Sequence, residues 1–306
     1  MSTAAGTALA IHKGRRPDAD AWFVKDVVDN WYEEYRALEG EGREFALPES
    51  KWRGSWAGSC ARQVAYHVAG VEETNPTTVA DAWRFWIGKL LHDKVQEQVM
   101  AKYPGSTIEG KVRIGEGGSG HFDILVVTPE GKRILIELKS INGTGYKMSV
   151  LGKAARERRP EGARVSAIMQ GAMYAASLDP LPDELIVAYF SLELVSQQNA
   201  MHYLADEYQR FASQWTFSQE DYLVIARDEM RRLDKIVAIT ERSGPGAVPR
   251  IVPDPNMPPH RIRNPRSGLY DIIDIETGDV IGKDRAWQCA YCSHQDQCAT
   301  DADAEQ

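Results

Sequence analysis

Apolar positions along this chain follow two different periods. The run "WRFWIGKLLHDKVQEQVM", residues 83–100, spaces its apolar side chains as an amphipathic helix does. The apolar face of this predicted helix consists of Phe85, Ile87, Leu91, Val95 and Val99, widened by Trp86 and Leu90. Short apolar runs at about 111–114, 121–128 and 133–139, and the run "ELIVAYFSLEL", predict strands instead.

Further helices are predicted at 20–45 and over most of 203–241. Another begins near Ser59 and includes Cys60, and a fourth ends with the stretch "VSAIMQGAMYAASL". The Pro-rich segment 243–268 is predicted to be irregular. These elements favour an α/β fold with a central mixed β-sheet flanked by helices. We divide the chain into a mobile tail (1–20), an N-terminal helical region (21–110), a core (111–242) and a C-terminal segment (243–306), all within one composite domain.

Composition limits the classes of protein that fit. The chain has 306 residues, of which 43% are hydrophobic, enough to bury a sizeable core. Its sequence contains no apolar run near the roughly 18 residues that span a bilayer, and its start lacks the apolar core of a secretion signal. We expect a cytoplasmic protein. The net charge of −8 argues against coating nucleic acid by bulk attraction, and leaves room for a local basic groove.

Three charged residues interrupt the apolar runs of "GHFDILVVTPEGKRILIELKS", residues 120–140. If "TPEGK" forms the loop of a hairpin, Val127 pairs with Arg133 and Leu125 with Leu135, and Asp123 then lies opposite Glu137. Side chains alternate between the faces of a strand, so Lys139 points the same way as Glu137.

Two opposed carboxylates repel each other unless a cation lies between them. A hard divalent metal such as Mg2+ or Mn2+ suits these oxygen ligands, and Lys139 could hold a phosphate or a nucleophilic water beside it. The pattern indicates phosphodiester hydrolysis. The alternative is a solvated strand face that keeps the hairpin soluble, but the neighbouring Ile, Leu and Val residues are typical of a buried sheet.

The four cysteines suggest a second site. Cys289, Cys292 and Cys298 lie in "WQCAYCSHQDQC", and Cys60 stands alone far upstream. Thiols stay reduced inside cells, so this spacing indicates a metal or cluster site with four thiolates. A zinc knuckle that uses His294 as fourth ligand, with Cys60 an ordinary buried thiol, is the alternative.

Taken together, these motifs resemble the PD-(D/E)XK nuclease superfamily. The order His92, Asp123, Glu137-Leu138-Lys139, then Gln170 and Tyr174, is similar to its RecB-like branch. One Cys before this core and C-x2-C-x5-C after it are similar to the iron-sulfur members, namely AddB-type nuclease domains and the CRISPR-associated exonucleases of the fourth Cas family. The resemblance spans roughly residues 55–300, and Phe122 stands where the family name has a proline.

The resemblance implies a restriction-endonuclease-like core and a role for each motif residue. Asp123 and Glu137 would ligate Mg2+ or Mn2+ together with His92 and the backbone carbonyl of Leu138, while Lys139 positions the water. Taken alone, His92 reads as an ordinary helix-surface histidine. Gln170 and Tyr174 lie one helical turn apart and could touch substrate or steady Lys139, or form the polar edge of an ordinary helix.

The cysteines would ligate a [4Fe-4S] cluster, a clasp between Cys60 and Cys289, which are 229 residues apart (289 minus 60). We expect a metal-dependent DNA exonuclease that acts on single-stranded or end-exposed DNA in recombination, repair or phage DNA processing. The alternatives are a DNA end-processing nuclease of CRISPR adaptation, and a catalytically idle DNA-binding subunit. Intact Asp123, Glu137 and Lys139 argue against the idle subunit.

Overall fold

The computed structural model divides the chain into two compact units, Met1–Phe45 and Ala46–Gln306. It describes residues 32, 33, 37, 50–75, 77–146, 163–194, 210–249, 261–263, 270–273, 280–283 and 292–304. In the first unit only Tyr32, Glu33 and Ala37 are described, and all three are helical. The rest of the helix predicted at 20–45 and the predicted tail lie outside the described residues, and the domain boundaries proposed above remain predictions.

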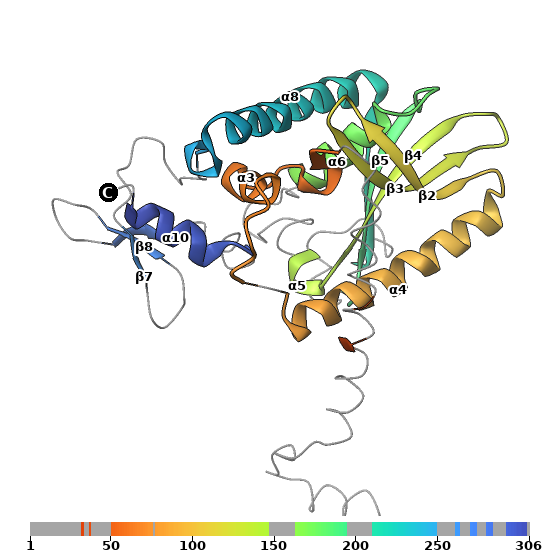
Figure 1. The fold of residues 1–306 in the computed structure, drawn as a ribbon. Coiled ribbons are helices and arrows are strands. Elements are labelled where there is room, and N and C mark those ends of the chain that lie inside the picture. Colours follow the sequence, from red (N-terminus) through yellow and green to blue (C-terminus); the bar gives the residue numbers. More distant parts are fainter. Residues whose placement is uncertain are drawn as a thin grey trace, which may run out of the picture. The chain divides into compact units, whose positions relative to one another are not determined.

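A mixed sheet forms the centre of the second unit (Figure 1). Six strands of the described chain belong to it: β1 (Trp52–Arg53), β2 (Thr107–Ile114), β3 (Gly118–Val127), β4 (Arg133–Ile141), β5 (Glu184–Ser191) and β6 (Ala212–Ser218). They follow the order β1-β3-β4-β5-β6, and β2 pairs with β3. The β4–β5 and β1–β3 pairs are parallel and the others antiparallel. The predicted strands and the mixed sheet are confirmed.

The two edges of β3 are occupied differently. β2 pairs with β3 from Gly118 to Leu125, so it takes one edge along most of the strand. β1 and β4 therefore share the other edge, with β1 at Gly118 and Ser119 and β4 from Ile124 onward. Between these two ladders, residues 120–123 of β3 face neither β1 nor β4.

Helices cover both faces of the sheet. They are α3 (Ala61–Val68), α4 (Val79–Lys102), α5 (Gly143–Gly145), α6 (Val165–Ala175), α8 (Gln219–Ser243) and α10 (Gln295–Ala304), with short 3-10 turns η2 (Gly54–Trp56) and η5 (Pro245–Ala247). A Cβ at Gly171 of α6 would lie 3.0 Å from Cβ of Glu137, and one at Gly88 of α4 would lie 2.6 Å from Oγ of Ser140. Residues 137 and 140 point to opposite faces, so α6 and α4 flank β4 from opposite sides. α8 packs over α6 (Figure 1).

Three differences from the predicted elements have physical reasons. Residues 212–218 form β6 rather than the start of the long helix, because "ASQWTFS" alternates half-buried Trp215 and Phe217 with exposed neighbours and pairs with β5. α3 begins at Ala61, and Cys60 is the residue before it. The Pro-rich segment contains η5 and the strand β7 (Arg261–Arg263), which pairs with β8 (Tyr270–Ile273), and β8 in turn pairs with β9 (Val280–Lys283).

The apolar face of α4 is only partly buried. Ile87, Leu91, Val95 and Val99 are half-buried, whereas Phe85 and Leu90 are exposed, as is Trp83. The residues of α4 that the fold buries are the small Ala82 and Gly88 and the polar Gln96. Hydrophobic spacing correctly predicted the helix, but it overestimated how much of its apolar face the sheet covers.

None of the helices in the described part of the chain combines the length and apolar composition that crossing a lipid bilayer requires.

Candidate active site

Asp123 and Glu137 lie where the ladder between β3 and β4 ends. The register pairs Val127 with Arg133 and Leu125 with Leu135, as predicted, and the last pair is Ile124 with Ile136. One step further on, the Asp123 side chain replaces the backbone partner: its Oδ2 accepts a hydrogen bond of 2.7 Å from the N–H of Leu138. The two carboxylates thus sit on adjacent strands at the point where backbone pairing stops.

Glu137 is fully buried, and its side chain has one polar neighbour among the described residues. Nζ of Lys139 lies 2.5 Å from its Oε1 in an ion pair. Neither carboxylate oxygen has a hydrogen-bond partner of good geometry within the described chain. A buried carboxylate is costly unless it is paired and hydrogen-bonded, so this group is ready to accept a further ligand.

Lys139 is tied to α6 through a short chain of side-chain hydrogen bonds. Its Nζ donates to Oε1 of Gln170 at 3.0 Å, and Nε2 of Gln170 donates to the hydroxyl of Tyr174 at 3.2 Å. The ring of Tyr174 is buried against two glycines: a Cβ at Gly54 or at Gly120 would come within 2.4 Å of it. The helical spacing of Gln170 and Tyr174 therefore places both on the side of α6 that faces β4.

Burial dominates the electrostatics of this group. It raises the pKa of Glu137 to about 8, with a further contribution from the charge of Asp123, although Lys139 acts in the opposite direction. Burial also raises the pKa of Asp123 to about 6, against the effects of Lys139 and the Leu138 N–H. Burial alone would lower the pKa of Lys139, but the charges of Glu137 and Asp123 outweigh it and raise that pKa. The described side chains thus leave the two carboxylates short of positive charge.

His92 approaches the group from α4. Burial lowers its pKa, and the positive charge of Lys139 lowers it further. The imidazole is consequently neutral at pH 7, the form in which histidine ligates metals. Leu138 is buried, and its backbone N–H is the group that binds Asp123.

Two residues near the site were missed by sequence reasoning. Nε2 of Gln96, a residue that is 3% exposed, donates to Oε1 of Glu109 at 2.8 Å and to the backbone carbonyl of Asp123 at 3.3 Å. Glu109 interrupts the β2–β3 register opposite Asp123 and has a left-handed backbone, with φ of 49°. The charge of Glu109 acts on the pKa of both Asp123 and Glu137. A glutamine in an amphipathic helix and a glutamate in a short strand are common, so nothing in the sequence indicated that Gln96 and Glu109 would lie beside the site.

The donor set fits a hard divalent cation in its chemistry. Asp123 and Glu137 supply carboxylate oxygens, and the buried Oε2 of Glu137, which has no hydrogen bond within the described chain, is the observation that favours a cation there. Within the described residues, no group of three or more His, Cys, Asp or Glu side chains is assembled closely enough to hold a metal ion. His92 and the carbonyl of Leu138 therefore remain predicted ligands.

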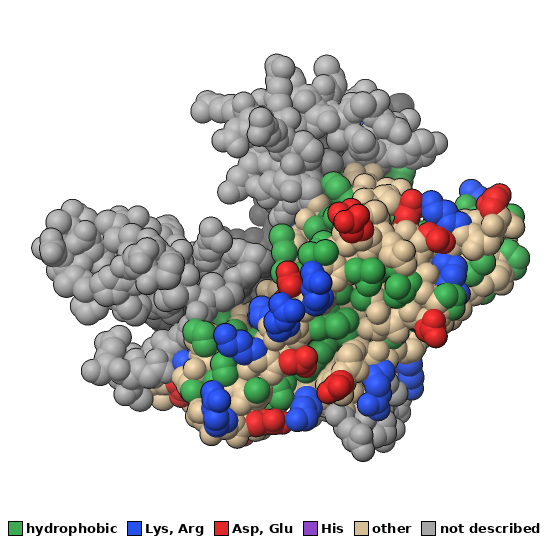
Figure 2. All heavy atoms as spheres, turned by 90° about the horizontal axis from the view of Figure 1, so that it is seen from above, with side chains coloured by type: hydrophobic (Ala, Val, Ile, Leu, Met, Phe, Trp, Pro, Cys, Tyr) green, Lys and Arg blue, Asp and Glu red, His purple; other side chains and the backbone are tan. Residues whose placement is uncertain are grey.

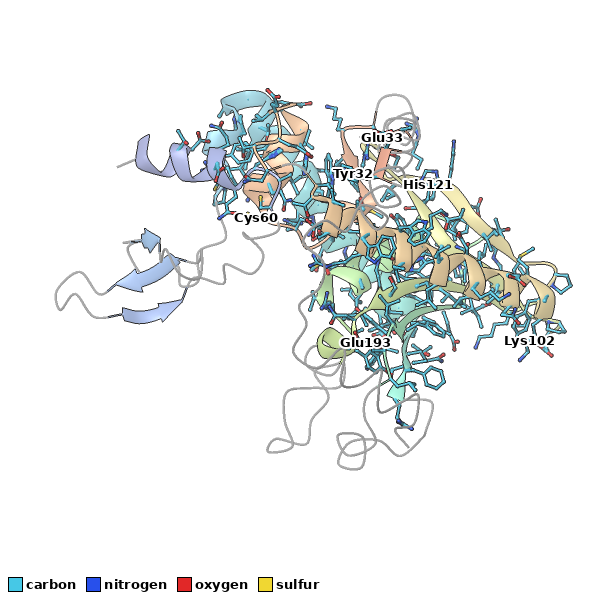
Figure 3. All side chains as sticks on the ribbon, turned by 90° about the horizontal axis from the view of Figure 1, so that it is seen from below. Tyr32, Glu33, Cys60, Lys102, His121 and Glu193 are labelled. Carbon is cyan, nitrogen blue, oxygen red and sulfur yellow. The ribbon has the colours of Figure 1, made fainter. Side chains whose placement is uncertain are left out.

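The described cysteines lie around the start of α3. Cys60 directly precedes that helix (Figure 3), and no disulfide joins Cys60, Cys292 or Cys298 within the described chain. Burial raises the pKa of Cys292, and the charges of Cys60 and Cys298 raise it further. Cys289 lies outside the described residues, so the four-thiolate set stays a prediction.

Residues 292–304 dock on α3 and the loop after it. The hydroxyl of Tyr66 donates to Oδ2 of Asp301 at 2.6 Å, and the N–H of Asn75 donates to the carbonyl of Ser293 at 2.9 Å. The buried ring of His294 lies 4.7 Å from the ring of His67. These contacts bring the segment that carries Cys292 and Cys298 to the helix that Cys60 precedes.

The loop before Cys60 is held by α8, through a feature the sequence did not indicate. Buried Glu229 accepts a hydrogen bond of 2.9 Å from the N–H of Gly58 and pairs with Arg232 at 2.7 Å. Arg232 in turn donates to the carbonyl of Ser59 at 3.3 Å. Hydrogen bonds at Gly58 and Ser59 therefore hold the loop that leads to Cys60 against α8.

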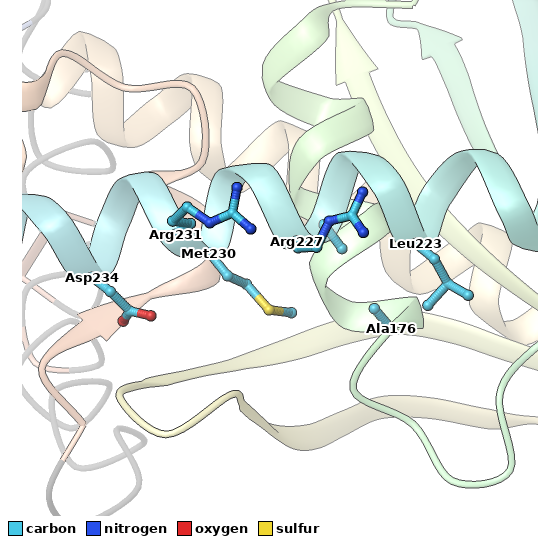
Figure 4. Close-up of a pocket in the computed structure, with 7 residues that line it drawn as sticks. Ala176, Leu223, Arg227, Met230, Arg231 and Asp234 are labelled. Atoms are coloured by element: carbon cyan, nitrogen blue, oxygen red, sulfur yellow. The ribbon is translucent and has the colours of Figure 1, made fainter.

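A pocket of about 620 Å³ lies elsewhere, on α8 (Figure 4). Its lining residues are Ala176, Leu223, Ala226, Arg227, Met230, Arg231 and Asp234. It shares no residue with the carboxylate group. On the face of the molecule seen from above, basic and acidic side chains are interspersed over the described part (Figure 2), so no charge of one sign gathers there. We do not assign the active site to this pocket.

Comparison with known proteins gives faint likenesses. No protein-family model matches the sequence, and no curated protein does. Among solved structures, the crystal structure of SSO0001 is 12% identical, with a TM-score of 0.45, over 92% of this chain and 98% of that chain. An alkaline exonuclease, LHK-Exo from Laribacter hongkongensis, is 12% identical, with a TM-score of 0.40, over 65% of this chain and 92% of that chain. Likenesses this weak do not show what this chain does, and the residues of the site are the basis for its function.

Proposed function

We propose that this chain is a Mg2+- or Mn2+-dependent deoxyribonuclease that hydrolyses phosphodiester bonds as an exonuclease in single-stranded or end-exposed DNA. The observation that carries the proposal is the buried Glu137 carboxylate, which lies across from Asp123 and whose Oε1 pairs with Lys139, while its Oε2 has no hydrogen bond within the described chain. A buried structural ion pair would have its remaining oxygens satisfied by donors. The unsatisfied oxygens of Glu137 therefore favour a ligand-binding role.

The residues of the site have separable roles in this reaction. Asp123 and Glu137 would hold the cation, together with His92 and the carbonyl of Leu138. A divalent cation bound there polarises a phosphoryl oxygen and lowers the pKa of a water molecule. Lys139, held by Gln170 at 3.0 Å, keeps a positive charge beside Glu137 and orients the attacking water. Tyr174 fixes the Gln170 amide, so that Lys139 is held from α6.

We further propose that Cys60, Cys289, Cys292 and Cys298 ligate a [4Fe-4S] cluster with a structural role. The docking of residues 292–304 on α3 and the loop after it supports this assignment, since it attaches the segment that carries Cys292 and Cys298 to the helix that Cys60 precedes. The chemistry assigned to Glu137 and Lys139 needs no electron transfer. Recombination, repair and phage DNA processing are the processes in which such an enzyme would act.

The test is digestion of end-labelled single-stranded and duplex DNA with and without Mn2+. Wild type should cleave only with the cation, and Glu137→Gln and Lys139→Ala should each lose at least about 10²-fold in rate while remaining folded. Lys111→Ala, a change to an exposed lysine on β2, serves as the matched control. Wild-type rates in either folded site variant would refute the assignment.

A further inference from the structure

The sheet-facing side of α4 continues past the end of β4. Gly88 packs against Ser140, one residue before β4 ends at Ile141. Phe85 lies three residues before Gly88, on the same side of the helix as buried Ala82 and Gln96, because residues turn by about 100° each. Its side chain is nevertheless 59% exposed. Phe85 therefore overhangs the end of the strand that carries Glu137 and Lys139.

Phe85 belongs to a line of residues on α4 that ends at the backbone carbonyl of Asp123. Phe85, Lys89, His92 and Gln96 follow one another at intervals of four, three and four, which places them on one helical face. At the inner end of this line, Gln96 donates to the carbonyl of Asp123. Nearer the outer end, Lys89 is 70% exposed, and the ion pair that it makes within the described chain is with Asp93 of the same helix, at 3.0 Å. An exposed pair of this kind is weak, so a phosphate could displace it.

We propose that Phe85 and Lys89 form a binding subsite for an unpaired DNA strand on its way to Asp123 and Glu137. The face of Phe85 stacks on one base, and the ammonium group of Lys89 contacts a phosphate beside it. The inference rests on the proposed nuclease function and names the form of substrate that the site receives.

The chemistry of the two residues favours an unpaired strand over a duplex. In a duplex the faces of the bases are already stacked on one another, whereas an unpaired base offers a free face to an aromatic ring. An exposed aromatic ring next to a cation is the combination that binds single strands without sequence preference. A protein partner docking on the wider apolar face of α4 is the competing occupant.

Binding measured in EDTA tests the subsite without requiring cleavage. A labelled single-stranded oligonucleotide and a blunt duplex of the same sequence are titrated with wild type, Phe85→Ala, Phe85→Trp and Lys89→Ala. We expect Phe85→Ala to weaken single-strand binding about tenfold and duplex binding less than about twofold. Phe85→Trp, which keeps an aromatic ring, should bind the single strand as tightly as wild type. Lys89→Ala should reduce the slope of log K against log salt by about 0.7. Leu223→Ala, at an exposed apolar residue of α8, is the matched control.

Each other outcome overturns the proposal in a recognisable way. Equal single-strand affinity for wild type and Phe85→Ala refutes the subsite while leaving the nuclease proposal intact. Equal losses for single strand and duplex refute the preference for an unpaired strand. Unchanged DNA affinity with altered self-association, measured by sedimentation, shows that this face binds protein. If wild type binds neither DNA, the proposed function fails together with the subsite.

Discussion

A buried carboxylate whose oxygens are incompletely satisfied costs folding free energy, and Glu137 is such a group, because its Oε2 has no hydrogen bond within the described chain. Its neighbours compensate only in part: Lys139 supplies one ion pair, while Asp123 and Glu109 add negative charge. Burial and the excess of negative charge raise the pKa values of Glu137 and Asp123, so both carboxylates bind protons more readily than usual. At the residue scale, the proposed cation would therefore compete with protons for these two carboxylates.

This competition gives metal binding a definite pH dependence. Burial raises the pKa of Asp123 to about 6 and that of Glu137 to about 8, so at pH 6 Glu137 is largely protonated and Asp123 about half protonated, and a bound cation would have to displace these protons. Apparent Mn2+ affinity should therefore rise from pH 6 to pH 8, by up to about tenfold per pH unit for each proton displaced. Calorimetry in buffers of different ionisation enthalpy measures both affinity and proton release. An affinity that stays constant over this range would contradict the assignment.

Gln96 makes a second residue-scale prediction. Gln96→Leu keeps the approximate volume but removes both donors, leaving the carbonyl of Asp123 without this partner. We expect the free energy of unfolding to fall by about 1–3 kcal/mol, and Mn2+ affinity to fall as well because Asp123 is no longer held in place. Urea denaturation and calorimetry measure the two effects.

The same substitution at Gln98 provides the control for Gln96. Gln98 lies on the same helix and is exposed, so Gln98→Leu should change stability by less than about 0.5 kcal/mol. If the two variants are equally stable and bind Mn2+ equally well, the hydrogen bonds of Gln96 have no role in the site.

At the scale of elements, the site depends on how closely helices approach the sheet. Glycines at 54, 120 and 171 leave room where a side chain would collide with Tyr174 or with Glu137 and Leu185. These close approaches set the chain of hydrogen bonds that runs from α6 to Lys139. A glycine in a strand or loop does not reveal by itself which ring will lie against it.

Gly120→Ala tests this packing. Its Cβ would lie 2.4 Å from Cε1 of Tyr174, so the ring must shift and its hydrogen bond with Gln170 is disturbed, and we expect a loss of about 1–3 kcal/mol in stability together with slower DNA cleavage. In a Tyr174→Leu background the same change should cost less, which a double-mutant cycle in urea measures. Gly105→Ala, where a Cβ meets nothing within 4 Å, is the control. Additive costs in the cycle would show that Tyr174 and Gly120 are not coupled.

An element could be predicted from the sequence where the contacts that form it are close together along the chain. The hairpin register could be predicted because the five-residue turn "TPEGK" fixes it locally, and the opposition of Asp123 and Glu137 followed. The residues of β6 were predicted to be helical, because the strand is stabilised by pairing with β5, which lies more than 20 residues earlier and leaves no mark on the local apolar pattern. Gln96, Glu109 and the exposure of Phe85 depend on where α4 crosses the sheet, which hydrophobic periodicity does not encode.

At the scale of the molecule, segments far apart in sequence meet at α3. Tyr66 binds Asp301, and Arg62 on the same helix donates to the carbonyl of Val248. Glu229 and Arg232 hold the loop before Cys60. The protein contacts alone therefore position residues 292–304, and a cluster would reinforce an arrangement that side chains already specify.

Two variants separate these contributions. Cys60→Ala should lose iron and acid-labile sulfide, whereas Asp301→Ala should keep them but lose the hydrogen bond from Tyr66. Both should speed limited proteolysis of the C-terminal segment, because each removes one of two independent attachments. Asp228→Ala, on the exposed face of α8, is the control. A Cys60→Ala protein with wild-type iron content and protease resistance would show that Cys60 takes no part in the clasp.

The placement of the candidate catalytic residues also has a consequence for how the protein is made. Every one of them, from His92 to Tyr174, is translated before β5, β6 and α8, the elements that complete the sheet and its cover. On the ribosome, β3 and β4 emerge with Asp123 and Glu137 before β5 can pair with the open edge of β4. A nascent chain therefore carries an unfinished site with an unpaired strand edge until β5 has been made, and residues 292–304, which dock on α3, are translated later still.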